Sequence, residues 1–358
     1  MCKKVAIIGS VGLPAKYGGF ETLVENITKY LNKDYKFTIY CSSKTYNKKL
    51  LTYNNSNLKY LRLKANGPQS ILYDLFAMID ALKYADTLLI LGVSGCSFLP
   101  IIKLISNQKI IVNIDGMEWK RQKWGWFSKL FLKFSESIAI KYADEIISDN
   151  KIIFDYINLN YSRKANLITY GGDHCKKIKI SEKLSKKYSF IKGPYVFSVC
   201  RVEPENNLEI ILKAFSSIKS KNLVVIGNWV DSSYGLSLKL KYSTNKNIYL
   251  LDSIYDQNIL NQLRSNCEIY VHGHSAGGTN PSLVEAMFMG LAILCYDVNY
   301  NTETTKNSAL YFKTHEDIIK IIREIKQNEL IKVSNKMKKI AKEKYTWNQI
   351  SKEYKLLL

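Results

Sequence analysis

A glycine-rich stretch that runs into an apolar segment carries the clearest chemical signal in this sequence. A short apolar run, 267–271, leads into the turn-rich residues 272–280, and Pro281 then opens a segment that ends at Gly290. Proline at the first helical position and glycine just past the last are typical helix boundaries, so we predict a strand, a loop and a helix. Glycines let a ligand approach the backbone closely, and the start of a helix favours an anion. With Glu285 about one turn into the helix to accept hydroxyl groups, the pattern suits a sugar nucleotide; a tight turn between strand and helix is the simpler alternative.

A second glycine-rich loop follows the first apolar run of the chain. Residues 5–8 are apolar, and an amphipathic helical pattern covers 20–31. The glycines between them are Gly9, Gly12, Gly18 and Gly19. Their spacing is not the Gly-x-Gly-x-x-Gly of a nicotinamide cofactor site. Tyr17, Phe20 and Glu21 stand at the end of this loop, where they either face a cleft or pack against the core.

Two carboxylates come directly after another apolar run, 110–114. Asp115 and Glu118 are followed by two cations, Lys120 and Arg121. A carboxylate at the end of a strand could orient an acceptor hydroxyl or take its proton. The alternative is structural, with Asp115 as a helix cap and Glu118 in an ion pair.

Short continuous apolar runs alternate with amphipathic segments along the whole chain. Such runs are typical of parallel strands that are buried on both faces. We expect strands near 5–8, 35–41, 58–63, 88–91, 110–114, 145–148, 166–169, 195–199, 223–226, 248–251, 269–271, 292–295 and 310–312. Two consecutive arrays of this kind predict an α/β protein of two Rossmann-like domains facing each other, with ligands beyond the carboxyl ends of the strands.

The length of the chain suggests two domains. The polar, lysine-rich residues 174–194 have little periodicity and are expected at the junction, so we assign 1–174 and 175–344 to the two domains. Near the end of the chain, 317–344 is expected to be helical, and 350–358 forms a last amphipathic segment.

Lysines and aromatic residues alternate at helical spacing between 119 and 142. The aromatic members are Trp119, Trp124, Trp126, Phe127, Phe131 and Phe134. This composition is typical of an interfacial helix on anionic lipid. The alternative is an ordinary helix with its aromatic residues in the core and its lysines in water.

The composition argues against several classes of protein. A net charge of +21 indicates an anionic partner, such as nucleic acid, a membrane surface or a phosphorylated substrate. No zinc finger, RNP-type aromatic motif or recognition helix stands out, so nucleic acid is not expected. The 7 cysteines form no Cys-x-x-Cys pair and His is scarce, so we expect a reducing cytosol, without disulfides or a zinc site. No signal peptide or membrane span is recognisable, and we expect a cytoplasmic protein.

The sequence resembles family 4 glycosyltransferases of the GT-B fold along nearly its whole length. Members carry two glutamates with seven residues between them in a loop and helix of the type EGFGLPLLEAM, which GGTNPSLVEAM at 277–287 matches in register. Pro281 and Glu285 fall on the expected positions, and the resemblance implies that Glu285 binds the nucleotide ribose. Gly277 stands where the first glutamate, which usually contacts the donor sugar, is expected. This departure affects the expected recognition of the sugar rather than of the nucleotide.

A pair of cations that clamps the donor diphosphate is another feature of the family. Arg201 matches the arginine, but Asn206 stands at the position of the lysine, so other donors such as the loop 9–19 or a helix dipole must supply the missing charge. The donor site implied by the resemblance comprises Gly12, Gly18, Gly19, Arg201, Asn206, Gly227, Asn228, Gly277, Gly278, Thr279, Asn280, Pro281 and Glu285. The implied acceptor site comprises Tyr17, Phe20, Glu21 and Trp119, and the residues assigned to catalysis are Asp115, Glu118 and Arg201.

Three stretches narrow the resemblance to a subgroup with its own type of N-terminal domain (DUF1972): GLPAKYGGFETLVENI, NIDGMEWKRQKWG and GGTNPSLVEAM. Several members resemble rhamnosyltransferases of bacterial capsule, O-antigen or cell-wall polysaccharide synthesis. The resemblance therefore implies a retaining transfer of L-rhamnose from dTDP-rhamnose to a lipid-linked saccharide, at the inner face of the cell membrane. It implies neither a cofactor nor a metal, because the leaving diphosphate is thought to accept the acceptor's proton and the chain has no Asp-x-Asp triplet. The helix within 345–358 is expected to return to the N-terminal domain.

Several alternatives remain open at this point. One is a transferase of the same fold that uses a UDP- or GDP-hexose. A GT-B epimerase would need several acids and bases near the sugar, and a phosphorylase would need a pyridoxal lysine; neither is apparent. An inactive sugar-nucleotide-binding or scaffold protein of a polysaccharide complex is the alternative from another class, because Gly277 and Asn206 both depart from the family pattern.

Overall fold

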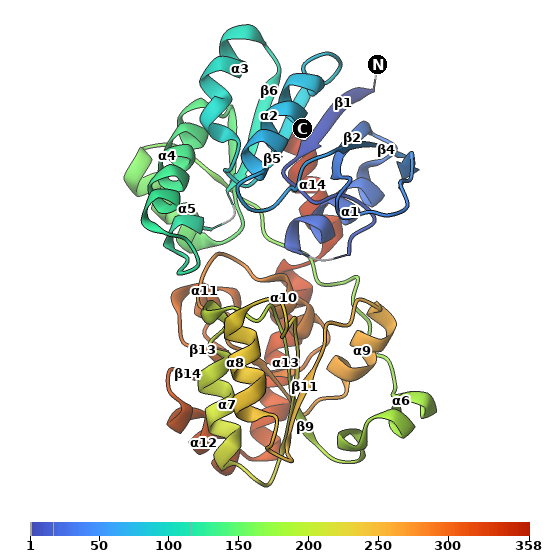
Figure 1. Ribbon diagram of the computed structural model, residues 1–358, viewed down its shortest axis with the longest axis vertical. Coiled ribbons are helices and arrows are strands. Elements are labelled where there is room, and N and C mark those ends of the chain that lie inside the picture. The colour runs from blue at the N-terminus through green and yellow to red at the C-terminus, as the bar shows by residue number, and fades with distance from the viewer. Residues whose placement is uncertain (1, 17, 115) are drawn as a thin grey trace. The chain divides into compact units, whose positions relative to one another are not determined.

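The structure, a computed structural model, describes residues 2–16, 18–114 and 116–358. Its contacts divide the chain into two units, Met1–Tyr170 together with Trp347–Leu358, and Gly171–Thr346. Each unit is built on one sheet with helices on its faces (Figure 1). The predicted α/β class with two Rossmann-like domains is therefore confirmed.

The first unit contains an eight-stranded sheet with the order β3-β4-β2-β1-β5-β6-β7-β8. Its strands are β1 (Lys3–Ile8), β2 (Tyr35–Ser42), β3 (Thr52–Tyr53), β4 (Ser56–Leu61), β5 (Thr87–Leu91), β6 (Lys109–Ile114), β7 (Glu145–Ser148) and β8 (Asn166–Leu167). Neighbouring strands are parallel except for β3 and β4. Every residue of β5 is buried, which explains why the run carries no polar alternation.

Helices cover both faces of this sheet. They are α1 (Gly19–Leu31), α2 (Ser70–Ala81), α3 (Leu99–Ile105), α4 (Trp126–Tyr142), α5 (Lys151–Tyr161) and α14 (Trp347–Leu357), with 3₁₀ turns η1 (Cys96–Phe98) and η2 (Glu118–Lys120). The last helix, α14, lies against α1. Its residues Trp347, Ile350 and Tyr354 share a core with Val5 and Ile27, so the end of the chain completes the first unit.

The second unit contains a six-stranded parallel sheet with the order β11-β10-β9-β12-β13-β14. Its strands are β9 (Tyr195–Val199), β10 (Asn222–Ile226), β11 (Ile248–Leu251), β12 (Ile269–His272), β13 (Ala292–Tyr296) and β14 (Leu310–Phe312). Its helices are α6 (Glu182–Lys187), α7 (Leu208–Ser217), α8 (Ser233–Tyr242), α9 (Gln257–Ser265), α10 (Pro281–Phe288), α11 (Asn299–Thr304), α12 (His315–Glu324) and α13 (Gln327–Lys344), with 3₁₀ turns η3 (Ser189–Lys192) and η4 (Pro204–Asn206). A separate apolar core fills each face of the sheet.

The segment near the end of the chain that was expected to be helical contains two helices. The expected helical structure over 317–344 is present, but α12 ends at Glu324 and Ile325 is extended, with φ −67° and ψ 130°. The backbone N–H of Lys326 then donates to the Glu329 carboxylate at 3.2 Å, which caps the start of α13. The sequence does not reveal this break, because no proline or glycine stands between the two helices.

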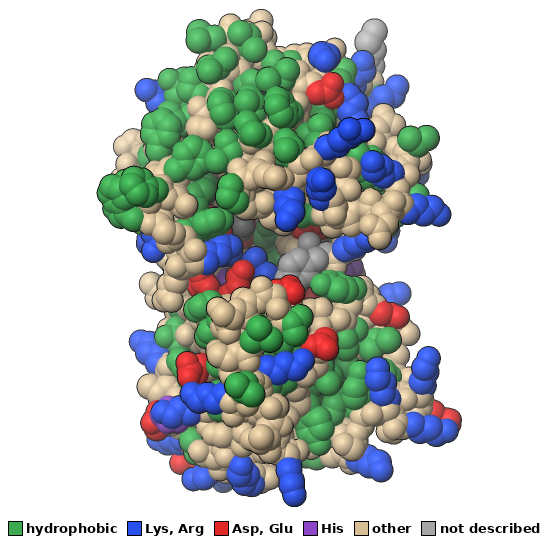
Figure 2. Space-filling view, viewed as in Figure 1, with side chains coloured by type: hydrophobic (Ala, Val, Ile, Leu, Met, Phe, Trp, Pro, Cys, Tyr) green, Lys and Arg blue, Asp and Glu red, His purple; other side chains and the backbone are tan. Residues whose placement is uncertain are grey.

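Apolar side chains gather on the surface of the first unit. On α4 the exposed ones are Trp126, Phe127, Leu130 and Phe134; α3 adds Ile101, Leu104 and Ile105, and α2 adds Leu72, Phe76 and Ile79. Figure 2 shows a broad apolar area over the part of the molecule where Figure 1 places these helices. Phe127 is 80% exposed, so the alternative that places the aromatic side chains of this segment in the core is wrong for the first turns of α4. We call the exposed residues of α2, α3 and α4 the apolar face.

Across the described residues, no helix combines the length and the apolar character that crossing a membrane requires.

Candidate functional site

Two loops meet at the point where the strand order of the second sheet reverses. Strands β9 and β12 are neighbours, and the chain runs outward from them in opposite directions, which is the position where open parallel sheets bind ligands. The backbone N–H of Ser275, after β12, donates to Glu205 O, after β9, at 2.8 Å. The side chain of Asn207 donates to Gly273 O at 2.8 Å. The two loops therefore form one continuous surface at the carboxyl ends of the strands.

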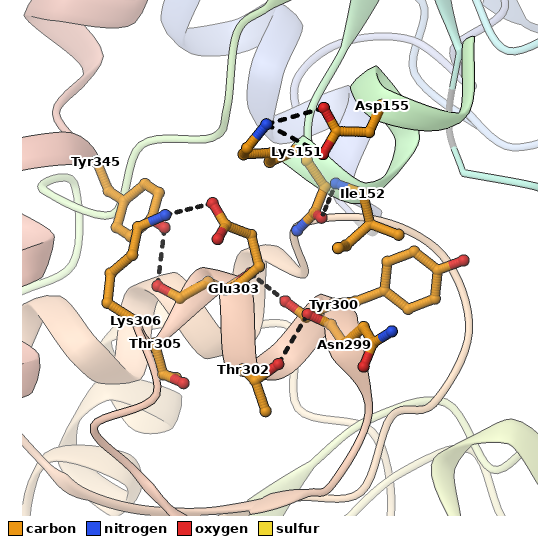
Figure 3. Close-up of polar contacts among 12 residues, drawn as sticks. Lys151, Ile152, Asp155, Asn299, Tyr300, Thr302, Glu303, Thr305, Lys306 and Tyr345 are labelled. Carbon is orange, nitrogen blue, oxygen red and sulfur yellow. Dashed lines mark hydrogen bonds and ion pairs between the residues drawn. The ribbon is translucent and has the colours of Figure 1, made fainter. Parts of the chain in front are cut away.

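Helix α11 braces the same loops from the other side. Asn301 donates to His274 O at 2.8 Å and to Tyr296 O at 2.9 Å, which ties the helix to the loop after β12. At the end of α11 the hydroxyl of Tyr345 donates to Thr304 O at 2.8 Å (Figure 3). Asn301 thus holds the loop after β12 to α11, and Tyr345 holds α11 to the segment that follows α13.

The predicted loop and helix at 272–290 are present, with α10 beginning at Pro281 as expected. Asn280 caps the helix by accepting from Ser282 N at 3.0 Å. Gly277 has a φ of 88°, a backbone conformation in which a side chain such as that of glutamate would be strained. The glycine at this position is therefore required by the turn itself. Within the loop, Thr279 is buried, while Gly278 is partly exposed.

Glu285 is the fifth residue of α10, with 14% of its side chain exposed. Nη1 of Arg264 donates to its Oε2, and Nε2 of His174 lies 3.2 Å from its Oε1. Burial alone would raise the pKa of Glu285, but the charge of Arg264 and the hydrogen bond from His174 lower it to about 2. The group is therefore a carboxylate at neutral pH, able only to accept hydrogen bonds.

Arg264 and His174 are the residues of this site that the sequence did not reveal. Arg264 stands in the last turn of α9 and is 0% exposed; its Nη2 donates to Cys175 Sγ at 3.3 Å and to Asn261 Oδ1 at 3.2 Å. Burial alone would lower the pKa of His174, but hydrogen bonds with Cys175 and Glu285 raise it to about 10. A signal in the sequence was that Arg264 stands four residues after Leu260, on the same face of an amphipathic helix.

Three side chains with metal-ligand chemistry meet here. One ligand atom each of His174, Cys175 and Glu285 lies within 4.8 Å of the others, and these are residue types that zinc accepts. However, the guanidinium of Arg264 bonds both Cys175 and Glu285. Because this cation already supplies the positive charge, a dication at the same place would be repelled, and the arrangement does not fit a metal site.

The loop after β9 carries the next group of predicted donor residues. Arg201 is partly exposed and lies 3.7 Å from Glu203 through Nη1 and Oε1. Asn206 is buried; its Nδ2 donates to Arg201 O at 2.9 Å and its Oδ1 lies 3.0 Å from His274 Nδ1. The side chain of Asn206 thus holds the two loops together, and its role in donor binding stays a prediction.

Gly227 and Asn228 follow β10 and shape the same loop. Asn228 accepts from Val202 N at 2.8 Å and donates to Asp231 at 3.0 Å. A Cβ on Gly227 would lie 2.7 Å from the Val202 side chain and 2.9 Å from Cys200 O. These two predicted donor residues therefore support the loop of Arg201 through local packing.

In the first unit, the strand order reverses between β1 and β5. Gly9 has a φ of 94°, and a Cβ there would stand 2.1 Å from Leu91 O, so the loops after β1 and β5 touch. Glu21 is buried and accepts from Val11 N at 2.6 Å, which folds the glycine-rich loop back on α1. Phe20 packs against the core beside Gly92.

The remaining residues predicted in this loop are its other glycines and Tyr17. Gly12 and Gly18 have φ of 126° and 113°, and Gly19 begins α1. A Cβ on Gly18 would lie 2.1 Å from Glu21 Oε2, so this glycine makes room for the carboxylate. Tyr17, like the predicted catalytic residue Asp115, lies outside the described residues.

The carboxylate of Glu118 is surrounded by three donors. They are Arg121 Nε at 2.9 Å, Lys123 Nζ at 3.2 Å and Trp124 Nε1 at 3.0 Å. This is the ion-paired arrangement that the sequence left open as an alternative, and a catalytic role for Glu118 stays a prediction. Both oxygens of the carboxylate have donors, and these contacts hold the turn after β6 in place.

Trp119 is anchored by a carboxylate that the sequence did not single out. Its Nε1 donates to Glu136 Oε2 at 3.1 Å, and the same buried carboxylate accepts from Tyr156 at 2.8 Å and from Tyr161 at 3.2 Å. The ammonium group of Lys133 lies 5.0 Å from the ring centroid of Trp119. The indole is thus held in one orientation beside the carboxyl end of β6.

Comparison with known proteins identifies two domains in the chain. Residues 2–173 match a domain of unknown function, DUF1972, and residues 180–344 match the family described as Glycosyl transferases group 1. Over 376 aligned residues the chain is 24% identical to an uncharacterized glycosyltransferase of Methanocaldococcus jannaschii, with 94% of each chain covered.

Solved structures show the same fold. A sucrose-phosphate synthase from Thermosynechococcus elongatus superposes with a TM-score of 0.83 at 14% identity, over 99% of this chain and 98% of that chain. HepE of Anabaena in complex with UDP-glucose gives a TM-score of 0.76 at 14% identity, over 99% of each chain.

The protein is thus an enzyme of the GT-B fold, a glycosyltransferase. Its C-terminal domain matches the group 1 glycosyl transferases, and its N-terminal domain has the type predicted from the sequence. Its assignment to the rhamnosyltransferases stays a prediction.

Proposed function

We propose that the enzyme transfers a sugar from a nucleoside diphosphate to a saccharide acceptor, with retention of the anomeric configuration. The observation that carries the proposal is Glu285, an ionised carboxylate about one turn into α10, which follows a glycine-rich loop. Nucleotide-sugar donors combine an anion with hydroxyl groups, and this site offers a helix start for the one and a carboxylate for the other. That HepE was solved with UDP-glucose supports the same ligand class.

Each part of the donor has a counterpart in the second unit. We assign the diphosphate to the loop 277–280 and to Arg201, whose side chain is partly exposed on the neighbouring loop. Glu285 accepts hydrogen bonds from hydroxyl groups of the ribose or deoxyribose ring of the nucleotide. Because the leaving diphosphate takes the acceptor's proton on the same face, catalysis consists of positioning and of stabilising the departing charge.

The proposed donor is dTDP-rhamnose, and the proposed acceptor is a lipid-linked saccharide of polysaccharide synthesis. The donor rests on the three subgroup stretches in the sequence. The acceptor and a location at the inner face of the membrane rest on the net charge of +21 and on the apolar face. Aromatic and apolar side chains next to lysines suit an anionic lipid surface.

The test is turnover with a panel of donors. Purified enzyme is incubated with dTDP-rhamnose, UDP-glucose, UDP-N-acetylglucosamine or GDP-mannose, each with a lipid-linked N-acetylglucosamine acceptor, and products are identified by mass. We expect transfer from dTDP-rhamnose and loss of transfer in Glu285→Gln. Transfer from a UDP- or GDP-sugar alone would replace the proposed donor. Nucleotide binding without transfer or donor hydrolysis would instead favour the inactive scaffold protein.

A further inference from the structure

The second unit contains an arginine that is fully buried, although burying a charge is costly unless it is well paired. Arg264 is 0% exposed, and its guanidinium spreads over Glu285, Cys175 and Asn261. Its Nε has no hydrogen-bond partner among the described residues. An apolar side chain would avoid these costs, so the arginine must serve the groups that it holds.

A ligand can reach Glu285 but not Arg264. Arg264 cannot touch a ligand, because its side chain is 1% exposed, whereas 14% of the Glu285 side chain is exposed. One oxygen of Glu285 is bonded by Arg264 and the other by His174 at 3.2 Å. A carboxylate offers about four acceptor positions, so each oxygen keeps one position for an incoming hydroxyl.

We propose that Arg264 is a positioning residue for the nucleotide, acting through Glu285. It orients the carboxylate so that the remaining acceptor positions meet hydroxyls of the ribose or deoxyribose ring of a nucleoside diphosphate. This proposal rests on the proposed function of Glu285 and deepens it, because it names the part of the ligand that the buried arginine serves.

The local contacts explain why a guanidinium suits this task. Its planar fork is fixed from behind by Cys175 at 3.3 Å and by Asn261 at 3.2 Å, so the N–H that reaches Glu285 has one direction. Without the arginine, burial would favour a protonated Glu285, which would donate rather than accept. His174 is a second, more exposed hold on the same carboxylate, and its loss should have a smaller effect.

The experiment measures how much the ring hydroxyls contribute to binding. dTDP and UDP are each titrated against the full-length enzyme by calorimetry, in parallel with their 2′,3′-dideoxy analogues. We expect the wild type to prefer the hydroxylated nucleotide by about tenfold or more, as for a hydrogen bond to a charged group. In Arg264→Met the preference should fall to near one, while affinity for the dideoxy analogue stays within about twofold of the wild type.

Two further variants test whether Arg264 acts through Glu285. Arg264→Met combined with Glu285→Gln should show the same preference as Glu285→Gln alone, because the two residues form one unit. Arg264→Lys, which restores the cation without the fork, should recover part of the preference. The matched control is Asn247→Leu: this buried residue donates to Phe215 O and Ile218 O just before β11, so its loss should lower stability without changing the preference.

Each outcome decides between the assignments. A folded Arg264→Met enzyme that still prefers the hydroxylated nucleotide overturns the proposal, and so does an equal loss of affinity for both ligands. If this variant does not fold, Arg264→Lys and His174→Ala carry the test, and an unchanged preference in both overturns it. A wild type that shows no preference removes the proposed role of Glu285 and that of Arg264 with it. If the wild type prefers the hydroxylated nucleotide and every Arg264 variant does so too, only the proposed role of Arg264 is removed.

Discussion

Gly273 and Asn206 are in such close contact that a Cβ on the glycine would stand 2.0 Å from the backbone carbonyl oxygen of Asn206. The contact joins the loops that follow β9 and β12, where the strand order of the second sheet reverses. Arg201 lies on one of these loops and the glycine-rich stretch on the other, so their relative position depends on a glycine that carries no chemistry of its own.

Gly273→Ala should therefore separate the two loops. We expect a loss of about 1–3 kcal/mol in the free energy of unfolding, because backbone has to shift, and a raised KM for the donor. Denaturant unfolding and donor kinetics measure both effects. Gly193→Ala is the control: it has a φ of −139° and nothing within 4 Å of the added Cβ, so its stability should stay within about 0.5 kcal/mol of the wild type. Equal behaviour of the two variants would contradict the steric argument.

Glu136→Ala should loosen Trp119. The change removes the acceptor of three hydrogen bonds, from Trp119, Tyr156 and Tyr161, and we expect a loss of about 2 kcal/mol in the free energy of unfolding. If the indole contacts the acceptor, KM for the acceptor rises while KM for the donor is unchanged. Lys141→Ala, on the exposed side of the same helix, should alter neither constant. An acceptor KM equal to that of the wild type would exclude Trp119 from the acceptor site.

The cluster around Glu285 predicts how stability depends on pH. The pKa of His174 is raised from 6.5 to about 10, so its stabilising contribution is complete below pH 6.5 and is lost as the pH rises towards 10. The pKa of Glu285 is lowered from 4.5 to about 2, so its contribution is present above pH 4.5 and is lost as the pH falls towards 2.

Urea unfolding of the wild type and two variants across this pH range checks the prediction. The difference in unfolding free energy between the wild type and His174→Ala should shrink between pH 6.5 and 10. The difference between the wild type and Glu285→Gln should shrink below pH 4.5. Differences that are constant with pH would show that the two groups do not titrate as the contacts require.

The apolar face predicts binding to anionic lipid. Phe127→Glu and Phe134→Glu should each weaken co-sedimentation with phosphatidylglycerol vesicles by about tenfold, because each removes an exposed aromatic side chain that would enter the lipid surface and adds a negative charge. The control is Leu240→Glu on α8 of the second unit, where leucine is 82% exposed, and it should bind as the wild type does. Binding that is independent of the anionic lipid content would argue against this role of the surface.

The sequence by itself determined the class of fold and the loop that leads into α10. Parallel strands buried on both faces require continuous apolar runs, and a helix start at Pro281 follows from local backbone preferences. These features depend on neighbours in the chain, so they are visible without the structure. The resemblance to glycosyltransferases depended on the same local stretches.

Only the tertiary structure decided which hydrogen-bond and ion-pair partners each polar side chain has. Glu118 is paired with cations, whereas Glu285 is held by Arg264 and His174, which are 21 and 111 positions away in the chain. Phe127 is exposed, although the apolar residues of its helix would be compatible with packing in the core. Pairing and burial depend on which distant segments fold against a residue, and the hydrophobic pattern of one segment does not contain that information.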